Sequence, residues 1–195
     1  MLINWKLREL NLKVVYYGPA FSGKTTNLIQ IHSKVDEQKR SELISLKTQE
    51  DRTLYFDFLQ LELGKINGLT PKIHLYTVPG QANYESSRRL VLHGADGVVF
   101  VADLSEDSLA ANIKAWKNMH NHLVSFGIVP ARFPMVVQFN KRDLPKALPY
   151  DRVADQMQVN GRPKFPAAAI QGEGVQETLK AIIQAVMQNI TRQIA

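Results

Sequence analysis

The chain has 195 residues, of which 45% are hydrophobic and 22% charged, and this composition predicts one folded domain over residues 1–195. It contains no cysteine, which excludes disulfides, thiolate metal clusters, cysteine nucleophiles and prenyl or palmitoyl anchors. The 24 Lys and Arg residues exceed the 18 Asp and Glu residues and give a net charge of +6, which indicates no particular partner unless it clusters.

The apolar runs and the two ends of the sequence predict no membrane insertion. No window approaches eighteen consecutive apolar residues, and the first residues lack the basic segment and long apolar core of a signal peptide. Leu2 stands where a myristoylated chain has glycine, and residues 191–195 form neither a prenylation box nor a polybasic tail. We therefore expect a cytoplasmic protein with no lipid anchor, whose membrane contacts would go through a surface or a partner.

Apolar runs of strand length alternate with segments of helical period, which predicts βαβ units around a largely parallel sheet. Strands are expected at 12–17, 53–59, 72–78, 97–103, 135–140 and 164–168, and helices at 24–33, 84–92, 108–126, 150–157 and 175–194. The alternation of Leu59, Leu61 and Leu63 before the turn signal Asn67-Gly68 predicts an antiparallel hairpin at one sheet edge. The expected fold is a three-layer α/β domain with a six-stranded, mostly parallel sheet.

A phosphate-binding pattern, GxxxxGK followed by Thr, comes directly after the first predicted strand and leads into a helix. In such loops the backbone N–H groups and the helix N-terminus surround the β-phosphate, and the lysine, Lys24, reaches the β- and γ-phosphates. The hydroxyl of Thr25 would ligate Mg²⁺. A chance turn would match in about one chain in a hundred of this length. The residues assigned to the nucleotide here are Gly18, Ala20, Phe21, Ser22, Gly23, Lys24, Thr25 and Thr26.

The fifth predicted strand ends in an NKxD sequence that starts at Asn140. The Asp143 carboxylate can accept hydrogen bonds from N1–H and the N2 amino group of guanine, whereas adenine offers no such pair, so GTP or GDP is expected. Asn140 would meet the N7 edge and brace the phosphate loop, and the stem of Lys141 would cover one face of the base. A backbone N–H of Ala168 or Ala169 would meet guanine O6.

Together these residues resemble the Ras-like small GTPase superfamily and, within it, the bacterial gliding-motility and polarity group called MglA, over almost the whole chain. The stretches that carry the closer resemblance are 16–19, 51–58, 74–81 and 140–145. Ordinary small GTPases end the third strand in DxxG, whose aspartate holds Mg²⁺ through water. Thr77 stands at that position here, as in the MglA group, and the sequence leaves open which carboxylate replaces the aspartate. Ala20 departs from the group, whose members usually carry glycine there.

The resemblance implies the P-loop GTPase fold (the G domain) and a switch that hydrolyses GTP with Mg²⁺. Gly80 N–H would contact the γ-phosphate, Gln81 would orient the attacking water, and Thr53 would ligate Mg²⁺ in the GTP state. Arg52 is similar to the group's intrinsic arginine finger, a device that contributes powers of ten in rate. Its alternative is a solvated ion pair with an acidic neighbour at 50 or 51. The expected catalytic residues are therefore Lys24, Arg52 and Gln81.

The resemblance also implies partners. They are an MglB-type roadblock-domain dimer as GTPase-activating protein, and polarity or motility effectors that would recruit the chain to a cell pole or to the inner membrane face. The basic residues with a clear task, Lys24 and Arg52, are assigned to a nucleotide, so we expect no nucleic-acid partner.

Two other functions stay open, a nucleotide-holding scaffold without useful hydrolysis and, more remotely, a phosphate-loop ATPase. Ala20 and Thr77 favour the scaffold, whereas Arg52 and Gln81 have no purpose in it. The five histidines show no metal-binding spacing, and Trp116 and Met119 are interpreted as core residues. Three residues near the second switch are expected on a solvated helix face, with an acidic partner or a membrane as the alternative: Arg88, Arg89 and His93.

Overall fold

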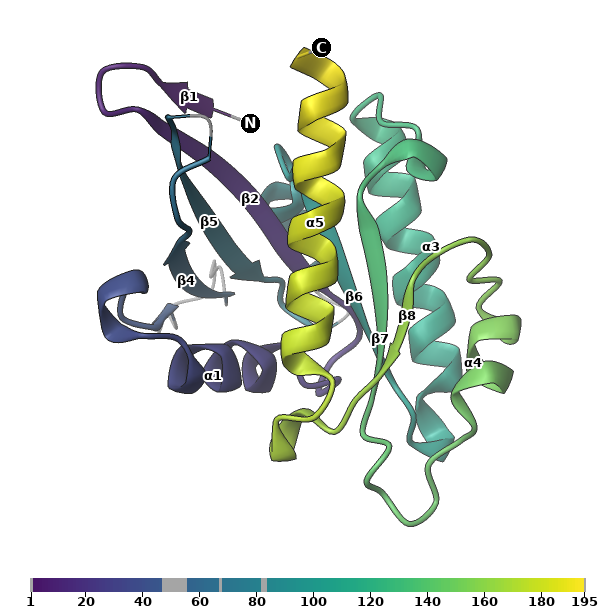
Figure 1. Cartoon of the computed structure of the whole chain (residues 1–195). Helices are drawn as coiled ribbons and strands as arrows, with labels where there is room; N and C mark the ends of the chain where they lie inside the picture. The colour runs from purple at the N-terminus through teal and green to yellow at the C-terminus, as the bar shows by residue number, and fades with distance from the viewer. Residues whose placement is uncertain (1, 47–55, 67, 82–83, 195) are drawn as a thin grey trace.

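A computed structural model describes residues 2–46, 56–66, 68–81 and 84–194 (Figure 1). Its centre is an eight-stranded sheet in the order β3-β4-β5-β2-β6-β7-β8, with β1 paired to β2 outside that path. The strands are β1 (Leu2–Asn4), β2 (Glu9–Tyr17), β3 (Ile44–Leu46), β4 (Phe56–Glu62), β5 (Thr70–Thr77), β6 (Gly97–Asp103), β7 (Met135–Asn140) and β8 (Lys164–Pro166). The pairs β2–β5, β2–β6, β6–β7 and β7–β8 are parallel, and β1–β2, β3–β4 and β4–β5 are antiparallel.

The expected α/β class and the mostly parallel sheet with an antiparallel edge are confirmed. The sheet has two strands more than the expected six, because β1 and β3 are three-residue strands without a periodic apolar pattern. β4 extends to Glu62 instead of ending at residue 59, since its pairing with β5 continues as far as Glu62 opposite Lys72.

Two helical layers cover the two faces of the sheet. The helices are α1 (Lys24–Lys34), α2 (Glu85–Leu92), α3 (Leu109–Ser125), α4 (Tyr150–Gln156) and α5 (Val175–Ile194). Alternate residues of β2 point to opposite faces: Val15 and Tyr17 pack with α2, α3 and α4, and Val14 and Tyr16 pack with α1 and α5. Figure 1 shows α5 crossing in front of the sheet. Trp116 and Met119 of α3 belong to the first of these cores, as expected.

The β4–β5 hairpin is also confirmed, and its core-facing residues Leu59 and Leu61 are buried. Ile66 and Leu69 exchange backbone hydrogen bonds across the turn, and Gly68 has φ +80°, the left-handed conformation that favours glycine; Asn67 lies outside the described residues. β3 pairs with residues 56–58 of β4 on its outer side, so this part of β4 is covered within the chain and β3 is the outermost described strand.

The parallel strands β2, β5, β6 and β7 all end at the same edge of the sheet, where ligands bind in open α/β folds. β4 runs the opposite way, so its first residues lie at that edge as well. This arrangement brings the phosphate loop, the end of β5 and the NKxD sequence together. No helix among the described residues is both long enough and apolar enough to span a bilayer.

Candidate nucleotide-binding site

The phosphate loop joins β2 to α1, and two of its residues must be glycine for it to fold as it does. Gly18 has φ +149° and Gly23 has φ +97°. A Cβ on Gly18 would collide with the carbonyl oxygen of Val101 on β6, and one on Gly23 would collide with Nδ2 of Asn140 on β7. Because neither position has room for a side chain, the loop lies directly against the ends of these two central strands.

Lys24, the first residue of α1, is buried beneath the loop. Its Nζ donates to the carbonyl oxygens of Gly18, at 3.2 Å, and Pro19, at 2.6 Å. The pKa of Lys24 is lowered from 10.5 to about 7, mainly by burial and also by the nearby Arg88 guanidinium, while the Asp57 carboxylate opposes both effects. The Lys24 ammonium is held by two carbonyl oxygens, and phosphate oxygens can replace them as its hydrogen-bond acceptors.

Asp57, at the start of β4, forms an acidic pole beside the loop and is only 8% exposed. Its Oδ2 accepts hydrogen bonds from the hydroxyls of Thr25, at 2.5 Å, and Thr77, at 2.9 Å. Its Oδ1 accepts one from Ser45 of β3 at 2.7 Å, and its backbone N–H donates to Thr77 Oγ1 at 2.8 Å. Sequence reasoning did not assign Asp57 to the site, although it is the carboxylate that directly contacts Thr77, the residue that replaces the DxxG aspartate.

The side-chain atoms gathered at the Asp57 carboxylate are the hydroxyl oxygens of Thr25, Thr77 and Ser45, so the possible metal ligands here are oxygen atoms. Mg²⁺ prefers such ligands and usually takes one or two carboxylates together with substrate phosphates. The chemistry of this cluster therefore fits the metal that the phosphate loop implies. Within the described part of the chain, no cluster of three or more His, Asp or Glu residues offers a rival metal site.

A cavity of about 580 Å³ opens above the loop. Its lining includes eight residues that the sequence assigns to the nucleotide or to catalysis: Ala20, Phe21, Gly23, Lys24, Thr25, Thr26, Gly80 and Gln81. Asp57, Thr77, Phe56 and Tyr84 complete much of the remaining wall. Gly18 and Ser22 lie outside this lining, and Ser22 is fully buried. Arg52 and Thr53 fall outside the described residues.

The second switch lies directly over the phosphate loop. A Cβ on Gly80 would collide with the backbone of Ala20 and would come within 3.0 Å of Lys24 Nζ, so this close approach requires glycine. The next residue, Gln81, is exposed and lines the cavity. A movement of Gly80 against Ala20 would therefore also displace the residues that surround the phosphate position.

The expectation of a solvated helix face is wrong for Arg88, which is only 7% exposed. Arg88 lies on the face of α2 that also carries the buried Val91 and Leu92, because residues three and four positions apart share a helix face. Its Nη1 donates to the carbonyl oxygens of Gln81, at 2.9 Å, and Gly80, at 3.5 Å. Arg88 thus holds the backbone of the second switch from inside. Its neighbours Arg89 and His93 are exposed, as expected.

The NKxD sequence forms the other end of the site. Asn140 donates from Nδ2 to the Ser22 carbonyl at 2.8 Å, so it braces the phosphate loop as expected. Lys141, with φ +71°, pairs through Nζ with Asp103 of β6 at 2.6 Å. Asp143 is exposed on the loop that follows. This end lies apart from the lining of the phosphate cavity.

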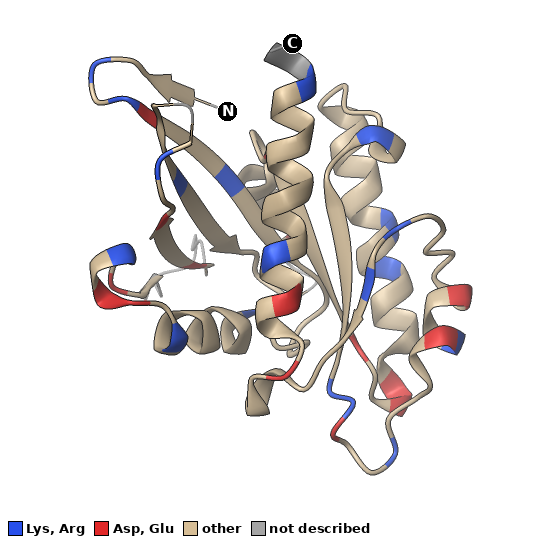
Figure 2. Cartoon of the chain, in the orientation of Figure 1, with Lys and Arg blue, Asp and Glu red and all other residues tan. Residues whose placement is uncertain are grey.

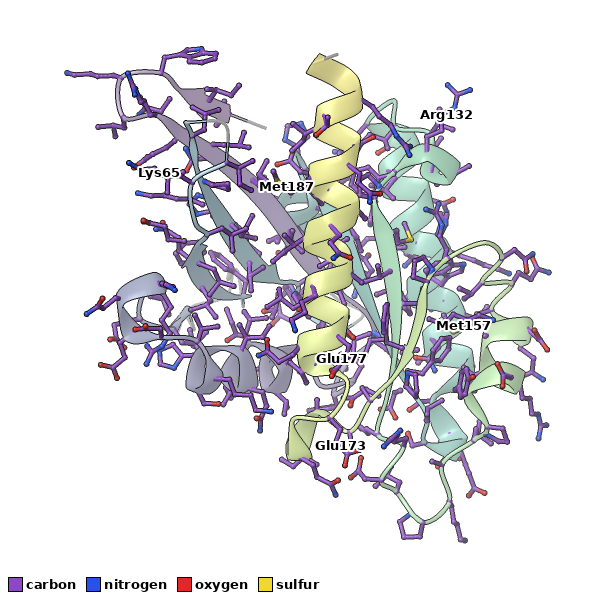
Figure 3. The ribbon with its side chains drawn as sticks, viewed as in Figure 1. Lys65, Arg132, Met157, Glu173, Glu177 and Met187 are labelled. Atoms are coloured by element: carbon purple, nitrogen blue, oxygen red, sulfur yellow. The ribbon has the colours of Figure 1, made fainter. Side chains whose placement is uncertain are left out.

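The assignment of guanine O6 to Ala168 or Ala169 stays a prediction, and the structure shows what the two amides contact within the chain. Ala168 N–H donates to the Glu173 carbonyl at 3.1 Å, and Ala169 N–H donates to Oδ1 of Asn140 at 2.8 Å. Both amides are used within the chain, so they brace this loop against β7. An exposed ion pair of 2.5 Å between Arg142 and Glu173 joins the same two loops; Figure 3 labels Glu173 at its lower end.

Comparison with known proteins matches the sequence model of the Ras family to residues 13–188. The mutual gliding-motility protein MglA of Myxococcus xanthus is 45% identical over 190 residues, which are 97% of each chain. Elongation factor 4 of Aquifex aeolicus is 27% identical over 84% of this chain and 28% of its own length. The Ypt/Rab-type GTPase YPT7 of Saccharomyces cerevisiae is 27% identical over 68% of this chain and 58% of its own.

Proposed function

The chain belongs to the Ras family, as a small GTPase of the MglA type, and from that premise we propose that it is a guanine-nucleotide switch that hydrolyses GTP to GDP and phosphate. The observation that carries the proposal is one arrangement: the buried Lys24 ammonium and the Asp57 carboxylate flank the same cavity at a helix N-terminus. A cationic group for phosphates beside an oxygen cluster for a metal is what phosphoryl transfer requires. Residues 1–195 act in this proposal as one small-GTPase domain.

The phosphate end of GTP is bound by the loop of residues 18–25. Its backbone N–H groups and the N-terminus of α1 attract the anionic β-phosphate, and Lys24 exchanges its two carbonyl partners for phosphate oxygens. Mg²⁺ would be held by Thr25 and, in the GTP state, by Thr53, and it would neutralise charge on the β- and γ-phosphate oxygens. In this proposal Asp57 takes the role of the usual DxxG aspartate, because Thr77, which stands at that position, has no carboxylate.

Substituting Asp57→Asn is expected to weaken Mg²⁺ binding 10- to 100-fold, about the effect of removing an outer-sphere partner of a metal site. The amide keeps the shape of the side chain but removes its charge. The measurement is the Mg²⁺ concentration that half-protects bound fluorescent GDP from release during titration with a chelator. Glu62→Gln removes an exposed carboxylate from the same strand and serves as the control. Equal Mg²⁺ requirements in both variants would remove Asp57 from the metal site.

Nucleotide affinity is expected to fall as the pH rises above 7. Free Lys24 has a pKa of about 7, and phosphates bind its charged form, so above pH 7 binding must take up a proton. The affinity should decrease up to about tenfold per pH unit. Dissociation constants for GDP between pH 7 and 8.5 and binding heats in buffers of different ionisation enthalpy measure this uptake. A flat pH profile would contradict the shifted pKa.

The same shift predicts how the stability of the nucleotide-free chain depends on pH. The pKa of Lys24 is lower in the folded chain than its ordinary value of 10.5, so the unfolded chain binds more protons between these values. The contribution of Lys24 to the free energy of unfolding therefore increases as the pH rises from 7 towards 10. Lys24→Met should flatten this part of the profile.

Hydrolysis is assigned to Gln81, Arg52 and Lys24. Gln81 orients the attacking water, Arg52 stabilises the charge that develops on the transferred phosphoryl group, and Gly80 contacts the γ-phosphate through its N–H. Arg88 supports this set, because its Nη1 donates to the carbonyl oxygens of Gly80 and Gln81. Phosphoryl transfer needs positioned positive charges, which Lys24 and Arg52 supply in this proposal.

Guanine selection is assigned to Asp143, with Asn140 as the brace that ties the base end to the phosphate end. Lys141 is turned into a left-handed backbone conformation and anchored on Asp103, which fixes the start of the base-binding loop. The ion pair between Arg142 and Glu173 supports the same loop from outside, although an exposed pair contributes little to stability. An ATPase would have no use for Asp143.

A nucleotide-holding scaffold is the second candidate, and Ala20 is the observation that favours it. The Ala20 backbone lies close to Gly80, so we infer that its methyl group lies near the γ-phosphate position and could crowd an attacking water or an arginine. If the methyl group obstructs them, Ala20→Gly should raise the single-turnover rate of GTP hydrolysis about tenfold or more. The native chain, loaded with the same nucleotide, is the reference. Equal rates would show that the loop tolerates alanine.

We further propose that an MglB-type roadblock-domain dimer activates hydrolysis, and that the GTP state binds polarity or motility effectors. These partners would bring the chain to a cell pole or to the inner membrane face. Support comes from the 45% identity with the gliding-motility protein over nearly the whole of both chains. Capture of proteins from the native cell by GTP-loaded and GDP-loaded chain tests it. Identical captured sets would contradict a switch.

A further inference from the structure

Two neighbouring hairpin tips project from the end of the sheet that is remote from the nucleotide cavity. The first tip is residues 2–8, formed by β1 and the loop to β2; the second is the β4–β5 turn at residues 65–69, of which residue 67 is not described. Arg8 joins them, since its carbonyl accepts a hydrogen bond from Thr70 N–H at 2.8 Å. β2 has nine residues, so the tips lie about 30 Å from the phosphate loop (Figure 1, upper left).

The tips carry large apolar side chains that the fold does not bury. Leu2 is 75% exposed, Trp5 73%, Leu7 60% and Ile66 43%. Tryptophan seldom stands on a loop in water, because its large ring stabilises a fold only when it is packed. Four such residues on two adjoining tips form an apolar patch for which the described fold has no internal use.

The charges on the tips have one sign. Lys6, Arg8 and Lys65 are exposed on the same tips as the apolar side chains; Figure 2 shows blue segments at both tips, and Figure 3 labels Lys65 at this end. The nearest carboxylates are Glu9, which pairs with Lys72 Nζ at 2.6 Å, and Glu62, which lies opposite Lys72 in the β4–β5 register. Lys6, Arg8, Lys65 and Lys72 outnumber the carboxylates of Glu9 and Glu62, so this end of the sheet presents a net charge of about +2 around an apolar centre.

We propose that the two tips form a reversible docking surface for an anionic lipid bilayer. Tryptophan is enriched at the level of lipid headgroups, where its ring is partly apolar and its N–H is hydrated. Lys and Arg beside it are attracted by anionic headgroups, and the apolar side chains enter the boundary of the acyl chains. Convex tips that carry separate side chains suit the deformable surface of a bilayer.

This orientation has a consequence for the switch. With the tips on the membrane, β2 runs away from the bilayer and the nucleotide cavity at its far end points towards the solvent. The second switch then stays accessible to partners in either nucleotide state. Docking adds a membrane contact to the proposed function and does not depend on hydrolysis.

Flotation of the full GDP-loaded chain with lipid vesicles tests the proposal. Vesicles of phosphatidylcholine alone are compared with vesicles that also contain phosphatidylserine, and nucleotide binding is measured on the same samples. We expect binding to the anionic vesicles only. The triple variant Lys6→Gln, Arg8→Gln, Lys65→Gln should bind about 100-fold more weakly, at about a fivefold loss for each basic residue. Trp5→Ser should also weaken binding, and brominated lipid should quench the native Trp5 fluorescence.

The matched control is Lys114→Gln, Lys117→Gln, Lys180→Gln, which removes the same charge from exposed positions on α3 and α5. It should bind anionic vesicles nearly as the native chain does. Equal losses in the two triple variants, equal binding to neutral vesicles, or no vesicle binding by the native chain would each overturn the proposal. Normal GDP binding by every variant shows that none of these outcomes reflects misfolding or failure of the nucleotide site.

Discussion

Replacing Arg52 with alanine is expected to slow single-turnover GTP hydrolysis about 10³-fold, because an arginine that stabilises the transferred phosphoryl group contributes at least that much. GTP and GDP affinity should stay within a few fold, since the charge it stabilises develops only in the transition state. The measurement is phosphate release from pre-bound GTP. Arg52→Lys should also be slow, because lysine lacks the planar fork of donors.

The control is Arg152→Ala, which removes an exposed arginine from α4 and should leave the rate unchanged. Gln81→Leu tests the water-positioning role in parallel and should depress hydrolysis while nucleotide binding is kept. A native rate in the Arg52 variant would return this residue to the alternative interpretation, a solvated ion pair near residues 50 and 51. Native rates in both variants would end the catalytic assignment.

Asp143→Asn is expected to lower GTP affinity about 10³-fold, because it disrupts two charge-assisted hydrogen bonds worth about 2 kcal/mol each. The same variant should gain affinity for xanthosine triphosphate. Its amide can donate to xanthine O2 and accept from N1–H, whereas the native carboxylate repels O2. Competition against a fluorescent nucleotide measures both changes. Asp151→Asn, an exposed carboxylate on α4, is the control. Unchanged GTP affinity in the Asp143 variant would show that Asp143 does not bind the guanine base.

The phosphate loop and the NKxD sequence could be predicted because their chemistry resides in consecutive residues. Gly23 must be glycine for the loop to fit against Asn140, and the GxxxxGK motif has glycine at this position. The strand and helix cores were predictable for a similar reason, since Val14 and Val15 alternate between the two faces of one strand. Local patterns of this kind do not depend on distant pairings.

Asp57 could not be predicted, because its role depends on strand register. The pairing of Phe58 with Tyr76 brings Asp57 beside Thr77, and a slip of one residue would turn its side chain to the opposite face. A strand-end carboxylate opposite an unusual threonine is the signal that could have found it. Asp57 and Thr77 lie 20 positions apart in the sequence, and the register that brings them together is not visible in either strand alone.

The position of Arg88 was misjudged, whereas the assignment of Ala168 and Ala169 stays a prediction. The charge of Arg88 indicated a solvated position, but its spacing to Val91 and Leu92 put it on the buried face, where backbone carbonyls receive it. The two alanines carry no side-chain signal, and their amides donate to the Glu173 carbonyl within the loop and to Oδ1 of Asn140 on β7. The partners of Arg88 and of Ala168 are backbone atoms, which sequence patterns do not mark.

The central claim, a switch that binds and hydrolyses guanine nucleotide, is tested most directly by single-turnover phosphate release from Mg–GTP and Mg–ATP. The purified chain is loaded with each nucleotide at the same concentration, and phosphate is followed over time. We expect one phosphate per protein from GTP and none from ATP, because adenine lacks the pair of N–H donors that the Asp143 carboxylate binds in guanine. Equal phosphate release from both nucleotides, or bound GTP that stays intact, would contradict it.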